Sequence, residues 1–477
     1  MKKSLLTLAL VALTCASAGA KTDGQVYEPV DGVKIANQWI LDRVHTPETY
    51  TKMGVCNTRA RTATMDEGIV YVSHSEAKTI VVAPGDTVVA AVIYRFDAKT
   101  GEQLPDLDVT LNGRPYGTFL GVTSIGVDNF HHIWVAPMTS DLATKIPFYM
   151  LDKETGELTL LLELEKGDVL HRTDYLDVMG DITRQEATCT VMTVAYATAD
   201  PGWTTIYRWY ADYDDEFVGG FKGQPSLEIT EFYPETKAGF SLAPIVKMCL
   251  GLDPEDIDDY YAGESFYIDC FDGAPTLYNF KGNLLDTFEE VDKALWPQSQ
   301  PNGMIEFMLD NERYFAYVIA DMNGNGHGCQ ANVCKYEISE DEDPSFAAMK
   351  KYWQIPADSL GKVNDTGLRV HCFAVENGTD EEGNEEVTLM TFKAYNGIAV
   401  YKIGRNVEGP DPGGEVLVGD VNGDGEIGIA DVTALVSLIL TTQQPTGDLL
   451  KRADVNQDGE VGIADLTALV AKLLEQQ

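Results

Sequence analysis

The sequence predicts a mainly β fold: a β-propeller of about six or seven blades, followed by a small all-α module. Strand-like runs recur with a shared turn motif across residues 36–403, where long helical patterns are scarce. A segment rich in Gly, Pro and acidic residues follows at 404–415, and the tail at 416–477 contains an internal repeat. Gly and Pro at this density cannot build a core. We therefore expect two folding units joined by a linker.

The first 20 residues are predicted to be an export signal. Lys2 and Lys3 precede an uncharged run from Ser4 to Leu13, and small residues at 18–20 suit signal peptidase, so we expect Lys21 to begin the mature chain. A lipoprotein signal at Cys15 is the minority alternative. The run is too short to span a bilayer, and no later stretch is long and apolar enough to do so. These features predict a secreted or extracellular protein, with cell-surface association as a variant, and residues 21–35 as a lead-in.

The charge and cysteine content exclude several classes of protein. Acidic residues number 75 and basic residues 35, which gives a net charge of −40. Such a surface repels nucleic acid and anionic lipid, so we expect no nucleic-acid partner. The cysteines after residue 20 are sparse and odd in number, which favours buried thiols over a disulfide scaffold. A bridge between Cys329 and Cys334 is the alternative.

A strand-and-turn repeat indicates the propeller. Runs at 124–128, 132–135, 148–152 and 158–164 make four strands, with a Lys-Glu-Thr-Gly-Glu turn at 153–157. A related run and turn occupy 93–102. A four-stranded repeat of this length is typical of propeller blades. The segment 37–41 is expected to complete the last blade and close the ring, and a pair of β-sandwiches is the alternative.

The tail contains the strongest signal. Residues 420–440 and 454–474 agree at 15 of 21 positions, at an offset of 34. Each copy opens with oxygen-bearing residues at loop positions one, three, five, seven and twelve and glycine at six. Because a hard divalent cation takes about six to eight oxygens, and alternate side chains of a tight turn converge, this spacing predicts two calcium sites. Their ligands would be Asp420, Asn422, Asp424, Glu426 and Asp431 in the first loop, and Asp454, Asn456, Asp458, Glu460 and Asp465 in the second.

A helix is expected after each loop. Val432, Leu435, Val436 and Ile439 share one helical face, and the second copy repeats the pattern with Leu466, Leu469, Val470 and Leu473. There is no room before either loop for the entering helix of a full EF-hand, and position twelve is Asp rather than Glu. The predicted unit is therefore a loop followed by a helix.

This loop–helix duplication resembles the type I dockerin family over residues 419–474. The resemblance implies a calcium-folded module that binds a cohesin-like protein. In that family, residues at loop positions ten and eleven often select the partner, and here they are Ile429, Ala430, Ile463 and Ala464. These pairs are more apolar than the hydroxyl pairs of many cellulosomal dockerins, so another surface protein is the alternative partner.

No catalytic motif is present, because GxSxG, HExxH and phosphate-loop patterns are all missing from the sequence. His131-His132 is interpreted as a surface turn and residues 321–326 as a Gly/Asn turn, rather than as metal sites. We expect a non-catalytic binding protein, with a propeller that recognises a glycan or protein and a tail that docks it. The alternatives are an extracellular glycoside hydrolase or polysaccharide lyase, and a tail that is only a stabilising cap.

Overall fold

The chain divides into two compact units in the computed structural model, a large one at residues 21–413 and a small one that includes residues 414–477. Among the described residues, no helix is long and apolar enough to cross a membrane. The expected export signal lies outside the described residues. The structure describes residues 22–47, 50, 60–117, 121–139, 145–165, 172–180, 189–196, 204–211, 228–232, 245–249, 265–269, 275–279, 284–287, 303–319, 329–336, 346–361, 371–409, 418–421, 427–439, 450 and 452–475.

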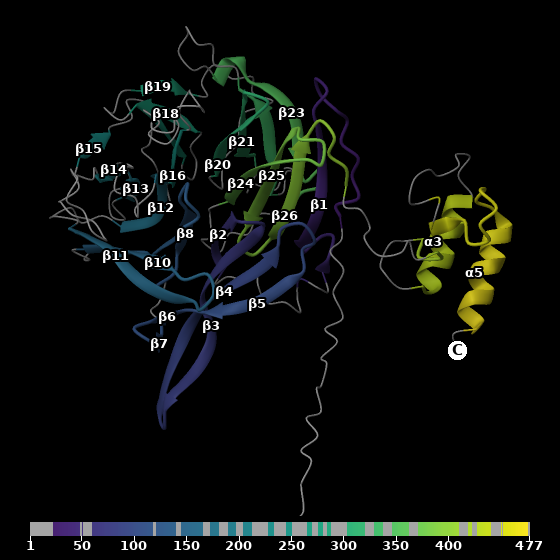
Figure 1. The fold of residues 1–477 in the computed structure, drawn as a ribbon, viewed down its shortest axis with the longest axis horizontal. Helices are drawn as coiled ribbons and strands as arrows, with labels where there is room; N and C mark the ends of the chain where they lie inside the picture. Colours follow the sequence, from purple (N-terminus) through teal and green to yellow (C-terminus); the bar gives the residue numbers. More distant parts are fainter. Residues whose placement is uncertain are drawn as a thin grey trace, which may run out of the picture. The chain divides into compact units, whose positions relative to one another are not determined.

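The large unit is a β-propeller-like array of antiparallel sheets (Figure 1). Five sheets in the described residues have four strands each. The strands of three of them are β2 (Ala60–Asp66), β3 (Ile69–Ala83), β4 (Asp86–Asp97) and β5 (Gln103–Asp108); β12 (Arg172–Gly180), β13 (Cys189–Tyr196), β14 (Thr204–Ala211) and β15 (Glu228–Phe232); and β16 (Ile245–Met248), β17 (Ser265–Asp269), β18 (Thr276–Asn279) and β19 (Leu284–Thr287).

Two more four-stranded sheets complete this set. Their strands are β20 (Met304–Leu309), β21 (Glu312–Val318), β22 (Ala331–Lys335) and β23 (Lys350–Ile355), preceded by the 3-10 helix η2 (Phe346–Ala348); and β24 (His371–Thr379), β25 (Glu385–Lys393), β26 (Gly397–Gly404) and β1 (Lys34–Asp42).

A sixth sheet departs from the expected pattern because it has six strands. They are β8 (Ser124–Val127), β9 (Ile133–Ala136), β10 (Lys145–Leu151), β11 (Glu157–Glu165), β6 (Thr110–Leu111) and β7 (Arg114–Pro115). The short β6 pairs parallel to β11, and β7 pairs with β6. The described residues therefore contain five regular four-stranded blades, which differs from the six or seven expected, and one enlarged sheet.

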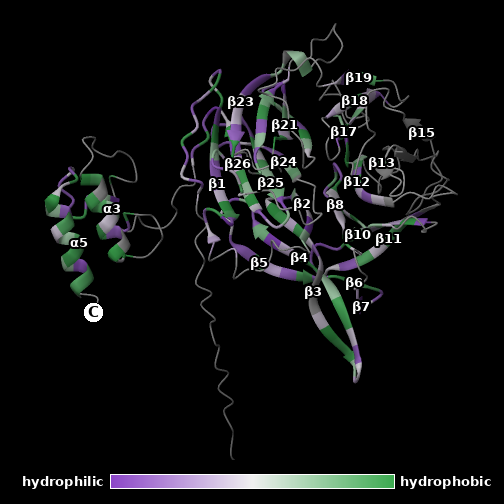
Figure 2. Cartoon of the chain, turned by 180° about the vertical axis from the view of Figure 1, so that it is seen from behind, coloured by the Kyte–Doolittle hydropathy of each residue, from purple (hydrophilic) through white to green (hydrophobic). Residues whose placement is uncertain are grey.

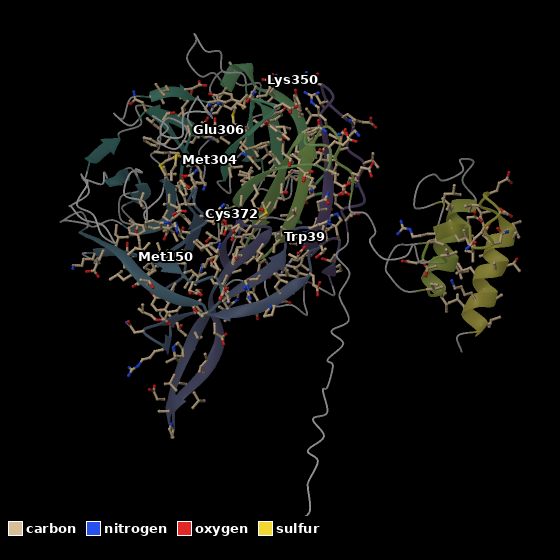
Figure 3. All side chains as sticks on the ribbon, in the orientation of Figure 1. Trp39, Met150, Met304, Glu306, Lys350 and Cys372 are labelled. Carbon is tan, nitrogen blue, oxygen red and sulfur yellow. The ribbon has the colours of Figure 1, made fainter. Side chains whose placement is uncertain are left out.

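Strand β1 closes the array of sheets, as was predicted for the segment 37–41. Strand β1 pairs antiparallel with β26, from Lys34 opposite Gly404 to Asp42 opposite Gly397. Trp39 (Figure 3) is buried, and its Nε1 donates a 2.8 Å hydrogen bond to the carbonyl of Ala98, just after β4 in the first sheet. The last sheet is thereby tied to the first.

The hydrophobic core lies between neighbouring sheets. Residues Ile398 to Tyr401 of β26 are all buried, so this strand is apolar on both faces instead of alternating. One face packs with Trp353 and Phe307 of the β20–β23 sheet, and the other packs with Phe96 of the first sheet. Figure 2 shows hydrophobic segments along the strands of this sheet.

The recurrent turn motif has a physical cause. Asp97 Oδ1 accepts hydrogen bonds from the amides of Lys99 and Thr100 at 3.0 and 2.7 Å, and Asp152 does the same for its turn. The glycine of each turn has a positive φ, 71° at Gly101 and 77° at Gly156. Asp, Thr and Gly at these spacings are therefore required by the turn between the third and fourth strands.

The described cysteines decide between the two predictions made for them, buried thiols or a disulfide bridge. Cys329 and Cys334 are both buried and unbridged, and so is Cys249, while Cys372 is partly buried. Burial raises the pKa of the Cys329 thiol to about 12. These side chains are packed as small hydrophobic groups, and the proposed Cys329–Cys334 bridge is wrong.

The described residues of the small unit include the helices α3 (Ile429–Ile439) and α5 (Ile463–Glu475). Its core is formed by Val421, Leu435, Ala453, Val461 and Leu469. On the two predicted apolar faces, Leu435 and Leu469 are fully buried, whereas Val436 and Val470 are 37% and 40% exposed.

Candidate central cavity, calcium loops and docking face

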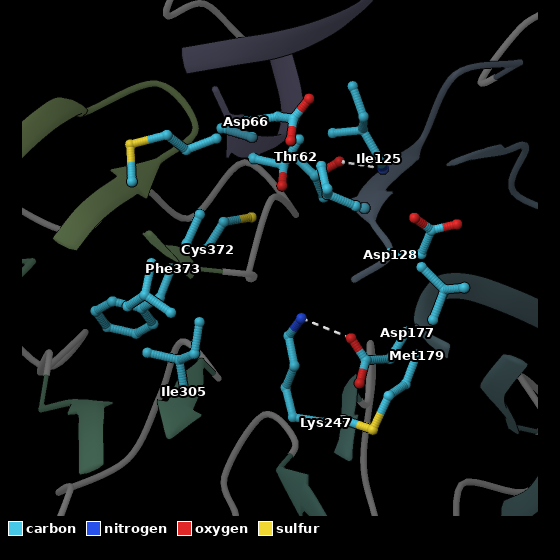
Figure 4. A pocket seen from close by; sticks show the side chains of 18 of the residues that line it. Thr62, Asp66, Ile125, Asp128, Asp177, Met179, Lys247, Ile305, Cys372 and Phe373 are labelled. Carbon is cyan, nitrogen blue, oxygen red and sulfur yellow. Dashed lines mark hydrogen bonds and ion pairs between the residues drawn. The ribbon is translucent and has the colours of Figure 1, made fainter. Parts of the chain in front are cut away.

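The innermost strands of all six sheets line one cavity of about 610 Å³ in the large unit (Figure 4). Side-chain oxygens on the innermost strand of one sheet accept hydrogen bonds from backbone amides on the innermost strand of the next sheet. Thr62 Oγ1 accepts from the amide of Ile125 at 3.0 Å, and Ser124 Oγ accepts from the amide of Leu176 at 3.0 Å. Asp177 Oδ2 continues the series by accepting from the amide of Met248 at 2.7 Å. These bonds hold the cavity wall in register from sheet to sheet.

Acidic side chains in the wall are bound to partners within the protein. Asp66 accepts from His131 Nδ1 and Lys153 Nζ, both at 2.7 Å. Asp128 contacts His132 Nδ1 at 2.9 Å and Trp134 Nε1 at 3.0 Å. Glu306 accepts from Arg313 at 2.8 Å and from Tyr267 at 3.0 Å. Because burying a charge is costly unless it is paired, these contacts are what allow carboxylates to line the cavity.

Lys247 is the only lysine or arginine among the described residues that line the cavity. Its Nζ lies 2.7 Å from Asp177 Oδ1, and the side chain is 32% exposed. Figure 4 shows the ammonium group reaching across the wall toward Asp177. An amine with part of its surface open is thus held inside the cavity.

Glu376 and His131 also line the cavity. Both oxygens of Glu376 accept from the amide of Gly68 at 3.1 Å, and burial raises the pKa of this carboxyl. His131 has a φ of 67°, in the left-handed region that few non-glycine residues adopt, and its side chain is 60% exposed. Raised pKa values and backbone strain are both common at functional sites.

The sequence did not identify these residues as a site. Residues 128–132 form a turn, as expected, but His131 and His132 bind different carboxylates rather than a common ligand. Asp66 lies 65 positions from His131 and 87 from Lys153 in the sequence, so no local sequence pattern predicts these contacts. The turn at 321–326 lies outside the described residues.

The second predicted calcium loop is described in full. Asp454 Oδ1 and Oδ2 accept from the amides of Asp458 and Gly459 at 2.9 and 2.8 Å. Asp465 Oδ1 and Oδ2 accept from the amides of Asn456 and Gly462 at 3.1 and 2.8 Å. Gly459 has a φ of 90°, the sharp bend expected at loop position six. The loop's own amides therefore hold its carboxylates.

Glu460 completes the predicted second set, and its amide donates to Asp458 Oδ1 at 3.0 Å. The first loop repeats the closing contact of the second, because Asp431 Oδ2 accepts from the amide of Gly428 at 2.7 Å. Asp420 and Asp431 are buried. The remaining predicted ligands of this loop, Asn422, Asp424 and Glu426, lie outside the described residues.

The chemistry of the second loop fits a calcium ion. Asp465 is fully buried, and no described basic side chain forms an ion pair with it. A cation beside this carboxylate would further offset the cost of burying its charge, in addition to the two backbone amides that it accepts from. In the described part of the chain, no three His, Cys, Asp or Glu side chains form a metal-holding group by themselves. Calcium loops of this type instead add amide, carbonyl and water oxygens, which Asn456 and Glu460 are placed to supply.

The predicted partner residues lie at the starts of the two helices. Ile429 is 82% exposed and Ile463 is 74% exposed, which is unusual for isoleucine. Ala464 is exposed beside Ile463, and Ala430 is the second residue of α3. We call the exposed apolar residues of this unit the docking face: Ile429, Val436, Ile463, Val470 and Leu474.

Residues 418–474 match the dockerin type I domain. We refer to them as the dockerin module, which follows the propeller-like unit along the chain. Dockerin type I domains bind calcium, and a dockerin implies a cohesin partner. Dockerin modules occur in extracellular or cell-surface proteins.

Similarity to curated proteins is weak. A 109-residue stretch is 28% identical to the tRNA (guanine-N(7)-)-methyltransferase of Mycoplasma genitalium, which covers 22% of this chain. The chain spans 50% of that protein's length. Its activity is not carried over to this chain.

Two solved structures are similar in arrangement. A DUF4623 family protein from Bacteroides eggerthii is 10% identical, with a TM-score of 0.47 over 80% of this chain and 77% of that one. AofleA from Arthrobotrys oligospora is also 10% identical, with a TM-score of 0.37 over 80% of this chain and 88% of that one. Scores this low support no conclusion about ligand or activity.

Proposed function

We propose that this is a secreted, non-catalytic binding protein. Its propeller recognises a glycan or protein, and its dockerin module, with one calcium ion in each of two loops, docks it to a cohesin-like or other surface protein. Residues 1–20 act as the export signal in this proposal. The two parts of the proposal, recognition and docking, are tested separately.

The docking face is the observation that carries the proposal. Ile429 and Ile463 begin equivalent helices, and each occupies position ten of a predicted calcium loop. Exposed aliphatic residues on a small module are costly in water unless a partner covers them. Because the two copies are nearly identical in sequence, each offers the same surface, and either one is expected to engage the partner.

Calcium connects the two features of the module. Asp431 and Asp465 lie in the first turns of α3 and α5, and both are fully buried. A cation bound to each carboxylate would fix the start of the helix that presents the isoleucine. Docking is therefore expected to require calcium.

The test of docking is capture of the full chain by an immobilised cohesin domain, with and without EGTA. We expect capture with calcium only. Ile429→Asp and Ile463→Asp should each retain capture, because the other copy remains, whereas the double variant should lose it. Val81→Asp, which alters an exposed valine of the large unit, is the matched control.

The outcomes separate the alternatives. Capture that persists in the double variant would contradict the docking face. If the module takes up calcium but no cohesin or surface fraction captures the chain, the tail is a stabilising cap.

One observation favours the enzyme alternative, a glycoside hydrolase or polysaccharide lyase. The carboxyl of Glu376, with its raised pKa, lines the cavity and is suited to donate a proton. Release of reducing sugar or of an unsaturated product from mixed polysaccharides, lost in Glu376→Gln, would replace the binding proposal by this one.

A further inference from the structure

We infer that the central cavity of the large unit binds one neutral, hydroxyl-rich group, such as a single sugar residue, and that Lys247 and His131 provide its polar contacts. This inference rests on the proposed role of the propeller in glycan recognition and gives that role a site. It is argued below from size, charge, available hydrogen-bonding groups and wall chemistry.

The cavity has the size and the position of a ligand site. Its volume of about 610 Å³ lies within the range of about 300–1,000 Å³ that is typical of small-molecule pockets. All six inner strands contribute to its wall. The bonds from Thr62 to Ile125 and from Ser124 to Leu176 fix neighbouring strands, so the wall is preformed and a ligand pays little to order it.

The charges in the wall argue against an ionic ligand. Six lining residues are acidic: Asp66, Glu67, Asp128, Asp177, Glu306 and Glu376. An anion would be repelled by them. A cation would have to compete with partners that they already hold, since Lys153 contacts both Asp66 and Glu67, and Lys247 contacts Asp177. A neutral ligand avoids both costs.

Lys247 supplies hydrogen-bond donors. An ammonium group has three N–H donors, and the contact to Asp177 Oδ1 uses one of them. With its side chain 32% exposed inside the cavity, Lys247 is able to donate to a ligand oxygen. Asp177 fixes the direction of the amine, because its other oxygen is bound to the amide of Met248.

His131 supplies an acceptor. Its Nδ1 faces Asp66, so the proton lies on that nitrogen in the neutral ring, and Nε2 keeps its lone pair. The side chain is 60% exposed and lines the cavity. Its φ of 67° belongs to the hairpin turn, in which the amide of His131 donates to the carbonyl of Asp128 and the amide of Asp128 donates to the carbonyl of His132. The turn therefore fixes the backbone that carries the imidazole, and a ligand hydroxyl is able to donate to Nε2.

Apolar side chains also line the wall. Figure 4 shows Met179, Ile305 and Phe373 around the same opening as Lys247. A ligand that fits this wall must accept a hydrogen bond from the amine of Lys247 and donate one to the imidazole of His131. It must also present carbon–hydrogen surface between these two contacts. A neutral sugar ring combines these three properties.

The test uses the full chain and named probes. Binding of D-glucose, D-galactose, D-xylose and N-acetyl-D-glucosamine is measured by saturation-transfer NMR and calorimetry, beside D-glucuronate and D-glucosamine as charged probes. At least one neutral sugar should bind. Lys247→Met and His131→Asn should each weaken it at least tenfold, whereas Lys145→Met, which removes an exposed lysine paired with Glu163, should not.

Asparagine at 131 tolerates the positive φ, so His131→Asn keeps the test decisive if Lys247→Met fails to fold, as judged by thermal unfolding. Undiminished sugar binding in a folded Lys247→Met or His131→Asn variant would overturn the inference but leave glycan recognition elsewhere on the propeller. Tighter binding of a charged probe than of its neutral counterpart would also overturn it. If no sugar binds, glycan recognition fails as well, while docking is judged by cohesin capture alone.

Discussion

At the scale of single residues, the turn glycines show most clearly how backbone conformation and close contacts limit which residue a position can hold. A Cβ on Gly156 would lie 2.4 Å from the carbonyl oxygen of Asp108, and Gly156 also has a φ of 77°. Gly113 has a φ of 70°, but a Cβ there would meet nothing within 4 Å. Alanine substitutions at Gly156 and Gly113 therefore distinguish a steric clash combined with conformational strain from conformational strain alone.

Gly156→Ala is expected to destabilise the large unit more than Gly113→Ala. Strain alone costs about 1 kcal/mol, and a clash with the backbone adds to it. The measurement is the midpoint of thermal unfolding of the two variants and the wild type by calorimetry. Equal midpoints for the two variants would show that the Asp108 backbone moves aside without cost.

His45 gives a prediction about pH. Its Nδ1 lies 2.7 Å from Asp42 Oδ2, and this hydrogen bond raises the pKa of His45. The pair therefore stabilises the fold fully below the unfolded pKa of about 6.5, and this contribution is lost as the pH rises through the higher folded value.

The unfolding midpoint of the wild type should exceed that of His45→Gln by a wider margin at pH 5.5 than at pH 9. Thermal unfolding at the two pH values measures the margin. A margin that is constant, or wider at pH 9, would contradict the assigned role of the Asp42–His45 pair.

How far residues could be predicted depends on how local their contacts are. The second predicted calcium loop, Asp454 to Asp465, could be proposed from sequence because its twelve residues are consecutive. The cavity groups were not, because Lys247 meets Asp177 from 70 positions away. Only the folded sheet order creates that contact.

At the scale of elements, strand β1 is the closing strand of the large unit, and Trp39 is its anchor. Trp39→Phe keeps the aromatic packing against Phe96 but leaves the carbonyl of Ala98 without the indole donor. The expected cost is about 1–3 kcal/mol, measured by chemical denaturation. Trp39→Ala should cost more, about 3–5 kcal/mol. Equal losses in the two variants would mean that packing contributes nothing at this seam.

The strand that closes the array was predictable because Trp39, Ile40 and Leu41 make a short strand-like run ahead of the repeated strands. Strands β6 and β7 were not, since two residues each carry no periodic pattern. The exposure of Val436 and Val470 was also missed, because helical spacing identifies an apolar face but does not tell whether a core or a partner covers it.

At the scale of the whole molecule, two compact units of unequal size predict separate unfolding. Calcium binds only the small unit in this account, so EGTA should abolish or lower one calorimetric transition and leave the other unchanged. Calorimetry of the full chain with and without calcium checks this. A single transition that moves as a whole would mean that the two units unfold together.

The most direct test of the account is calcium titration of the EGTA-treated, dialysed full chain, followed by calorimetry and circular dichroism. We predict two bound ions per chain and a gain of helical signal as α3 and α5 form. Asp431→Ala and Asp465→Ala should each remove one ion, and the double variant both. No heat of binding and an unchanged spectrum would contradict the account.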